Sequence, residues 1–148
     1  MKKTESGQSL FEVVVALAIS TIIIIALVSL VSNSIKNATF SRNKTLAARY
    51  AQEATEWLRG ERDNDIEVFK TNILTLTWCL QNLDWDNSGP CLSDEKISGT
   101  LFTREVSFST TTVSSKVVIQ ADISVSWDDS QGTHEVRSST NFSDWRER

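Results

Sequence analysis

The stretch that decides the fold is residues 13–31, which read VVVALAISTIIIIALVSLV and contain no charged residue, glycine or proline. The uncharged stretch continues as far as Ile35. Because an α-helix rises about 1.5 Å per residue, this stretch can cross a hydrocarbon core about 30 Å thick. It therefore predicts a transmembrane helix. The alternative is a cleaved secretory signal, but such a signal has an apolar region of only about 7–15 residues followed by a small-x-small cleavage site, and neither feature is present.

A single carboxylate stands directly before the apolar stretch. Glu12 is the only charged residue between Glu5 and Lys36. A carboxylate at the edge of hydrocarbon, or inside it, is costly unless it has a partner. Glu12 is therefore a candidate functional residue, and the alternative is a charge at the level of the lipid headgroups on a plain membrane anchor.

The residues around Glu12 resemble a known processing signal. The run Gly7-Gln8-Ser9-Leu10-Phe11-Glu12, followed by VVVALAI, is similar to the class III signal of type IV pilins and type II secretion pseudopilins. The resemblance implies that a prepilin peptidase cuts after Gly7, on the cytoplasmic side of the membrane, and methylates the new amino terminus at Gln8. Glu12 then takes the place of the family's assembly glutamate. Many members have Phe or Met where this chain has Gln8, a departure that bears on the methylation.

The same resemblance implies a domain organisation. Residues 1-7 are the leader peptide, 8-35 the transmembrane and filament-core helix, 36-60 the exported amphipathic half of that helix, and 61-148 a globular α+β head. The one proline of the chain is Pro90, so the membrane segment lacks the helix-breaking proline of many major pilins. In this respect the chain looks more like a minor pilin or a minor pseudopilin.

The implied function is that of a minor type IV pilin-like structural subunit in an extracellular pilus or its initiating tip. The precursor would cross the inner membrane once, with its head outside the cytoplasm. Its partners would be other pilin or pseudopilin subunits, the prepilin peptidase, the inner-membrane assembly platform and, before assembly, membrane lipid. One alternative is a minor pseudopilin of a type II secretion system in a periplasmic filament. Another is a single-pass membrane-anchored binding module that does not polymerise.

The helical pattern continues beyond the membrane segment. Ala47, Ala51, Ala54 and Leu58 recur at spacings of three and four, which is typical of one face of an amphipathic helix. Because no glycine or proline interrupts the chain before Gly60, we expect one helix over residues 8–59, followed by a polar turn over residues 61–64. Residues 66–83 mix both patterns and are expected to be helical.

The C-terminal part predicts an antiparallel meander. Its clearest strand alternates apolar and polar residues from Val117 to Trp127. Phe102, Val106 and Phe108 indicate a strand before it, and Val136 with Phe142 a strand after it, joined through residues 128–133. The apolar face of such a sheet needs a cover, and the exported half of the long helix is the available element. The predicted fold class is therefore α+β, a long helix on a β-meander, which is also the pilin fold.

The two cysteines predict a disulfide. On this topology Cys79 and Cys91 lie outside the cytoplasm, where disulfides form and persist. The alternative is a pair of unpaired core thiols.

The segment between and after the cysteines has the spacing of a calcium loop. Oxygen-bearing side chains stand at Asp84, Asp86 and Ser88, a glycine follows at position 89, and Glu95 is the twelfth residue. The alternative is an acidic, disulfide-closed surface turn. The sequence favours that alternative, because Cys91 lies within the loop and residues 96–99 do not resemble an exiting helix. No other cofactor is expected.

Composition excludes several other classes of protein. Lys+Arg 15 against Asp+Glu 19 leaves a net charge of -4, with no basic surplus to neutralise a row of phosphates, so nucleic acid is not an expected partner. One histidine and two cysteines are too few for a Cys/His zinc site. His134 has no nucleophile-elbow motif beside it and no glycine-rich phosphate loop occurs, so no catalytic activity is expected.

Overall fold

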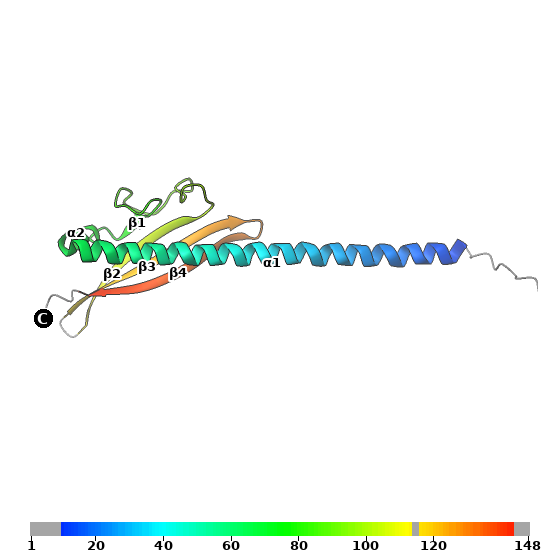
Figure 1. The fold of residues 1–148 in the computed structure, drawn as a ribbon, viewed down its shortest axis with the longest axis horizontal. Helices are drawn as coiled ribbons and strands as arrows, with labels where there is room; N and C mark the ends of the chain where they lie inside the picture. Colours follow the sequence, from blue (N-terminus) through cyan, green and yellow to red (C-terminus); the bar gives the residue numbers. More distant parts are fainter. Residues whose placement is uncertain (1–9, 114–115, 144–148) are drawn as a thin grey trace, which may run out of the picture. The chain divides into compact units, whose positions relative to one another are not determined.

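The structure, a computed structural model, describes residues 10–113 and 116–143. Two helices and four strands follow one another along the chain (Figure 1). They are α1 (Leu10–Asn64), α2 (Ile66–Asn72), β1 (Thr77–Cys79), β2 (Thr103–Val113), β3 (Lys116–Asp129) and β4 (Gly132–Ser143). The chain divides into two compact units, Met1–Arg42 and Asn43–Arg148.

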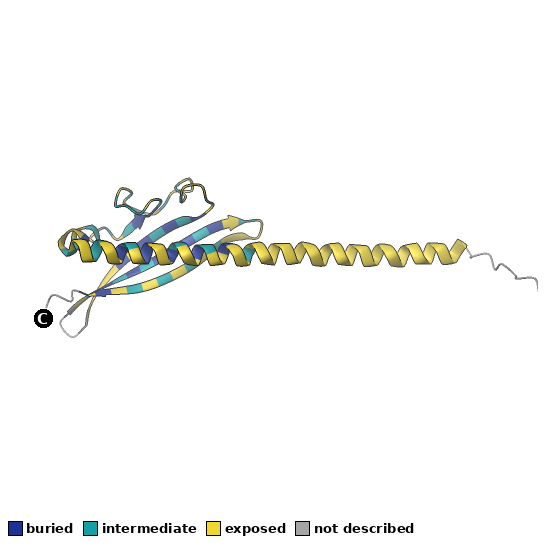
Figure 2. Ribbon diagram, in the orientation of Figure 1, coloured by how far each residue is buried: buried dark blue, intermediate teal, exposed yellow. Residues whose placement is uncertain are grey.

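The described part of the first unit consists of helix alone. Every side chain from residue 10 to residue 39 is exposed, as the unbroken yellow ribbon of Figure 2 shows. The hydroxyls of Ser20 and Thr21 donate to backbone carbonyls of the same helix, those of Ala16 and Ala18, each at 2.8 Å. These polar side chains therefore need no partner outside the helix. The helix is long and apolar enough to cross a membrane, as the sequence predicts.

The second unit contains an antiparallel sheet in the order β1-β2-β3-β4. The predicted meander is confirmed for its three long strands, and the short β1 adds a fourth. Inward-facing residues alternate with outward-facing ones along β2 and β3, as the strand pattern requires. The inner face carries the buried side chains of Val106, Phe108, Ile119, Ala121, Ile123, Val125, Trp127 and Phe142.

The last turns of α1 cover this inner face. Ala47, Ala51, Ala54 and Leu58 are at most 1% exposed, so the predicted helix face and its place on the sheet are confirmed. Three alanines in this stripe let the helix backbone lie close to the sheet, because they add little bulk between the two. Figure 2 shows dark blue residues both in the last turns of α1 and on the strands that these turns cross in this view.

The expected polar turn over residues 61–64 is wrong, because α1 continues through it to Asn64. Contacts of this last turn with the rest of the unit explain the difference. Glu61 accepts a hydrogen bond from the indole of Trp85 at 2.8 Å, and the Arg62 guanidinium lies 5.5 Å from the ring centroid of Phe142. Tertiary contacts of this kind override the low helix propensity of Gly60.

The expected helix over residues 66–83 is only partly right. Asp65 caps α2 by accepting from the backbone N–H groups of Glu67 and Val68, but the helix ends at Asn72. The following residues turn and enter β1, where Trp78 pairs with Val106 of β2. The β-prone residues at positions 75–78 therefore decide the second half of this segment.

Candidate functional site

The predicted processing and assembly site lies at the start of the chain. Gly7 and Gln8 fall outside the described residues. Glu12 lies in the first turn of α1 and is exposed, where a carboxylate also complements the positive end of the helix dipole. The residues that follow it present a wide apolar surface, with Leu17 62% exposed and Ile25 70% exposed. Apolar surface of this extent requires lipid or another protein to cover it.

The predicted disulfide is present between Cys79 and Cys91, whose Cα atoms are 4.7 Å apart. It joins β1 to the segment that carries the acidic residues. Backbone hydrogen bonds hold the same segment: Cys79 donates to Asn87 at 3.0 Å, and Gly89 donates to Thr77 at 2.9 Å. The bridge and these bonds together fold residues 79–91 back along the outer side of β1.

The disulfide loop presses an aromatic side chain onto the core. Trp85 lies between the cysteines in sequence, and its ring centroid is 4.7 Å from that of Trp57 and 5.2 Å from that of Trp78. Phe69 and Phe108 also contact it, each with ring centroids 6.3 Å away. Because aromatic contacts of this kind add to area burial, the loop stabilises the second unit.

Removing the bridge should therefore destabilise the second unit. We expect the double variant Cys79→Ala, Cys91→Ala to lose about 3 kcal/mol of unfolding free energy, because the closed loop no longer constrains the unfolded chain. Urea denaturation followed by tryptophan fluorescence measures this, since all five tryptophans follow residue 56. Addition of reductant to the unsubstituted chain is the matched control and should give the same loss. An unchanged denaturation midpoint in both would contradict the prediction.

The four residues of the predicted calcium loop are only partly brought together. Asp86, Ser88 and Glu95 line one shallow depression of about 340 Å³, whereas Asp84 does not. Asp84 instead accepts from the backbone N–H of Asp86 at 3.3 Å, and Glu95 accepts from the backbone of Leu92 at 2.7 Å. Within the described residues, the ligand-type atoms that lie within 4.8 Å of one another are those of Glu95 and of the two bridged cysteines. Calcium binding stays a prediction of the sequence spacing.

The sequence analysis missed a buried cation on the inner face of the sheet. The Arg104 side chain is 3% exposed and contacts the Glu53 carboxylate of α1 at 2.9 Å. Its Nε donates to the carbonyl of Leu80 at 3.0 Å, and its Nη1 also donates to the carbonyl of Tyr50 at 3.3 Å. Burial lowers the pKa of Arg104, while the hydrogen bond and the negative charge of Glu53 act in the opposite direction. An arginine remains protonated under these conditions, so Arg104 links α1 to the sheet through charged hydrogen bonds.

A signal for Arg104 was available in the sequence. It stands two residues from both Phe102 and Val106, and alternate residues of a strand share a face. Once these two apolar residues are placed inward, Arg104 must point inward as well. A buried arginine then requires a carboxylate partner.

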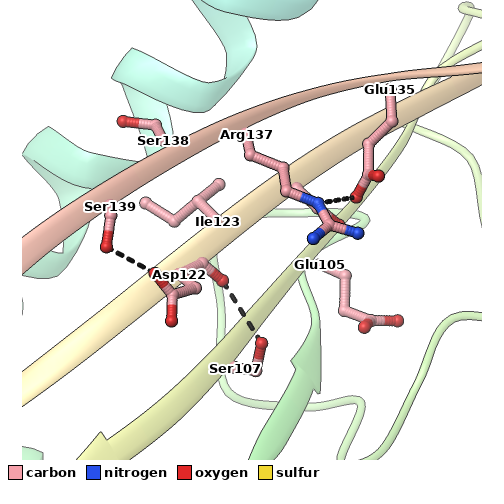
Figure 3. Close-up of a pocket in the computed structure, with 9 residues that line it drawn as sticks. Glu105, Ser107, Asp122, Ile123, Glu135, Arg137, Ser138 and Ser139 are labelled. Atoms are coloured by element: carbon pink, nitrogen blue, oxygen red, sulfur yellow. Dashed lines mark hydrogen bonds and ion pairs between the residues drawn. The ribbon is translucent and has the colours of Figure 1, made fainter.

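The outer face of the sheet carries a polar depression of about 520 Å³ (Figure 3). Asp122 lies at its centre and accepts hydrogen bonds from the hydroxyl of Ser139 and the amide of Gln120. Beside it, Arg137 pairs with Glu135 at 2.9 Å. All these groups come from neighbouring positions on β3 and β4.

The hydrogen bonds within this depression stabilise the charged forms of Asp122 and Arg137. The hydroxyl of Ser139 and then the amide of Gln120 lower the pKa of Asp122, so its carboxylate is held as the anion. The hydrogen bond that Arg137 donates to the Glu135 carboxylate raises the pKa of Arg137. General acid catalysis needs a group that still carries its proton near neutral pH, which Asp122 does not provide. The arrangement suits recognition of polar or charged groups.

The single histidine lies at the start of β4. His134 Nε2 is 2.9 Å from the Asp129 carboxylate, across the turn between β3 and β4. The pKa of Asp129 is lowered, first by the backbone N–H of Gln131 and then by this contact with His134. Gly132, with φ +118°, closes the turn in a conformation that glycine adopts without strain. The pair therefore fixes the hairpin end.

Comparison with protein-family models, with curated proteins and with solved structures returned no match to this chain. The assignment of function therefore rests on the residues and on the geometry described above.

Proposed function

We propose that this chain is a minor type IV pilin-like structural subunit, processed by a prepilin peptidase and incorporated into an extracellular pilus or its initiating tip. One observation carries the proposal. The helix that begins at Leu10 as an exposed apolar rod, with Glu12 in its first turn, is the same helix whose last turns form part of the core of the second unit.

The exposed apolar residues need a cover in the membrane before assembly and again in the filament after it. Before assembly, lipid can cover residues 13–35, because this stretch is long enough to span the hydrocarbon core. In a filament, the same stretch of other subunits can replace the lipid, because van der Waals packing between apolar helices is available in both settings. A subunit that leaves the membrane for a filament therefore loses none of the cover of its apolar surface.

The charges at the start of the chain suit such an exchange. Cleavage after Gly7 would remove Lys2, Lys3 and Glu5 and leave a free amine at Gln8, close in sequence to Glu12. In a region of low dielectric, an amine and a carboxylate attract one another far more strongly than in water. The neighbouring subunit's amine can therefore neutralise Glu12, which supports a role of this residue in assembly.

Two other functions use the same features. A minor pseudopilin of a type II secretion system would have the same processing and helix, but a periplasmic filament. A single-pass membrane-anchored binding module would use the helix as an anchor only, and it would present the polar outer face around Asp122 as its binding surface. The binding module predicts an uncleaved chain and no requirement for Glu12.

Intact-mass analysis of the protein from its own cells tests the proposal. We expect a mature chain that begins at Gln8, with or without a methyl group on its amine. Replacement of Gly7 by a large residue should leave the longer precursor in the membrane, because a peptidase that cuts beside a glycine approaches the backbone where a Cβ would interfere. A chain that begins at Met1, or normal maturation of the Gly7 variant, would contradict processing. Co-isolation with pili, as opposed to secretion-system components, separates the pilin from the pseudopilin.

A further inference from the structure

The two edges of the sheet differ in how well they are protected. At the opposite edge of the sheet, the folded-back segment covers the short strand β1: Trp78 forms a β-bridge with Ser88, and the backbone of residues 87 and 89 bonds to β1. On the other side lies β4, a strand of 12 residues whose pairing with β3 runs without a bulge. A long edge strand without a bulge is a template for pairing with another strand.

The alternation of the ladder identifies the backbone groups that β4 leaves for a partner. Asp129 and Gly132 flank the turn of two residues and pair with one another, so they exchange both ladder hydrogen bonds. From there, every second residue of β4 bonds to β3, namely the even-numbered ones. The N–H and C=O groups of the odd-numbered residues, such as Glu135 and Arg137, point away from β3, to a side where the described residues place no further strand.

The side chains at this edge are complementary to their own copy. Glu135 and Arg137 flank Val136 and carry opposite charges on the outer face. In an antiparallel pair of two β4 strands with Val136 opposite Val136, each Glu135 stands opposite an Arg137. Residues 135 and 137 then form a hydrogen-bonded pair and Val136 a non-hydrogen-bonded pair, as the alternation requires. Centring the pair on Glu135 or Arg137 instead would place like charges opposite one another, which is unfavourable.

We propose that β4 is a docking edge for a second copy of this chain, which pairs antiparallel through β4 with Val136 on the two-fold axis. The inner side of this edge has room for the partner's side chains. A depression of about 400 Å³ lies between β4 and the end of α1. The helix lines it with four small or uncharged residues, Ala48, Ala51, Gln52 and Thr55, and with the charged residues Glu56 and Arg59.

The symmetry fixes which chains can meet in this way. A two-fold axis perpendicular to the sheet reverses the direction of every element that runs in the plane of the sheet, including the last turns of α1. Two chains joined through β4 therefore have these helix ends running in opposite directions. The proposal goes beyond the function proposed above and stands without it.

Disulfide trapping on the full-length chain in detergent micelles tests this register. In the proposed pair the two Val136 Cα atoms are about 4.5 Å apart, within the range that a disulfide bridges. We expect Val136→Cys to give a covalent dimer under mild oxidation. Ser138→Cys is the matched control, because the two copies of residue 138 lie about 14 Å apart in this register. The unsubstituted chain controls for reshuffling of the native bridge.

Charge-reversal variants distinguish disulfide trapping in the proposed register from trapping by random collision. In the Val136→Cys background, Glu135→Arg places like charges opposite one another and should lower the dimer yield about tenfold, or about 1.4 kcal/mol. The double exchange Glu135→Arg with Arg137→Glu should restore the yield, because it restores both opposite pairs. Tryptophan fluorescence of each variant checks that the head is folded. Equal trapping of Val136→Cys and Ser138→Cys, no trapping of either, or no rescue by the double exchange would each overturn the proposal.

Discussion

Replacing Glu12 by alanine is expected to leave the chain inserted in the membrane and cleaved, and yet to deplete it about tenfold from sheared filaments. Insertion should persist because the apolar segment of residues 13–31 is unchanged and loss of a charge makes insertion easier. Cleavage should persist because the proposed cut after Gly7 lies outside the substituted position.

Assembly should suffer because, in the proposed filament, Glu12 is the acidic partner of the amine at Gln8 of an incoming subunit. A tenfold change corresponds to about 1.4 kcal/mol, a modest fraction of what an opposite-charge contact contributes where little water is present. Glu12→Asp keeps the charge and Glu12→Gln keeps the shape, so the pair shows which of the two matters. We expect Asp to retain more incorporation than Gln.

Quantitative immunoblotting of membrane and sheared-filament fractions measures this effect. Lys36→Ala is a suitable control, because it removes the first charge at the other end of the apolar stretch. Equal amounts of Glu12→Ala and unsubstituted chain in purified filaments would remove the assembly role and leave Glu12 as a charge at headgroup level.

Replacing Arg104 by alanine should cost about 4 kcal/mol of unfolding free energy. The substitution removes charge-assisted hydrogen bonds to the carbonyls of Leu80 and Tyr50 and leaves a cavity beneath the helix. Leu80 is fully buried, so water cannot easily replace its lost donor. The loss should therefore exceed that expected for removal of the disulfide.

Two further variants test whether burial of Arg104 causes the large expected loss of unfolding free energy. Glu53→Gln keeps an acceptor near Arg104 and, because Glu53 is 53% exposed, should cost only about 1 kcal/mol. Arg59→Ala removes an exposed ion pair with Glu56 on the same helix and should cost less than about 0.5 kcal/mol. Urea denaturation of the full chain in micelles, followed by tryptophan fluorescence, measures all three. A cost for Arg104→Ala no larger than that for Arg59→Ala would contradict the prediction.

The long helix and the three long strands were predictable because their signals are local and repetitive. Residues 13–31 have no charge, and β3 alternates apolar and polar residues from Ile119 to Trp127. The helix face at Ala47, Ala51 and Ala54 was equally readable, since a period of 3.6 fixes it without knowledge of the partner. Such patterns can be recognised in the sequence because many residues contribute to each of them.

The other elements depend on single contacts, and the sequence does not state them. The continuation of α1 past Gly60 depends on Trp85 and Phe142, which lie far away in sequence. β1 has only three residues, too few to show a period. The tie between Arg104 and Glu53 joins residues 51 positions apart, and neither residue indicates its partner. The candidate site divides in the same way: the bridge of Cys79 and Cys91 was predictable because the only two cysteines of the chain are expected outside the cytoplasm, while the grouping of the acidic side chains depends on the path of the loop.

The geometry of the β4 edge limits how many copies of this chain can pair through it. Two copies that pair through β4 each use their β4 edge in the same contact. The result is a closed pair, because neither copy has a second β4 edge to offer to a third copy. Pairing through β4 therefore stops at two copies and does not by itself propagate as a fibre. Open-ended growth of this protein would require a surface that each new copy offers again. The apolar part of α1 is such a surface, because every side chain from residue 10 to residue 39 is exposed.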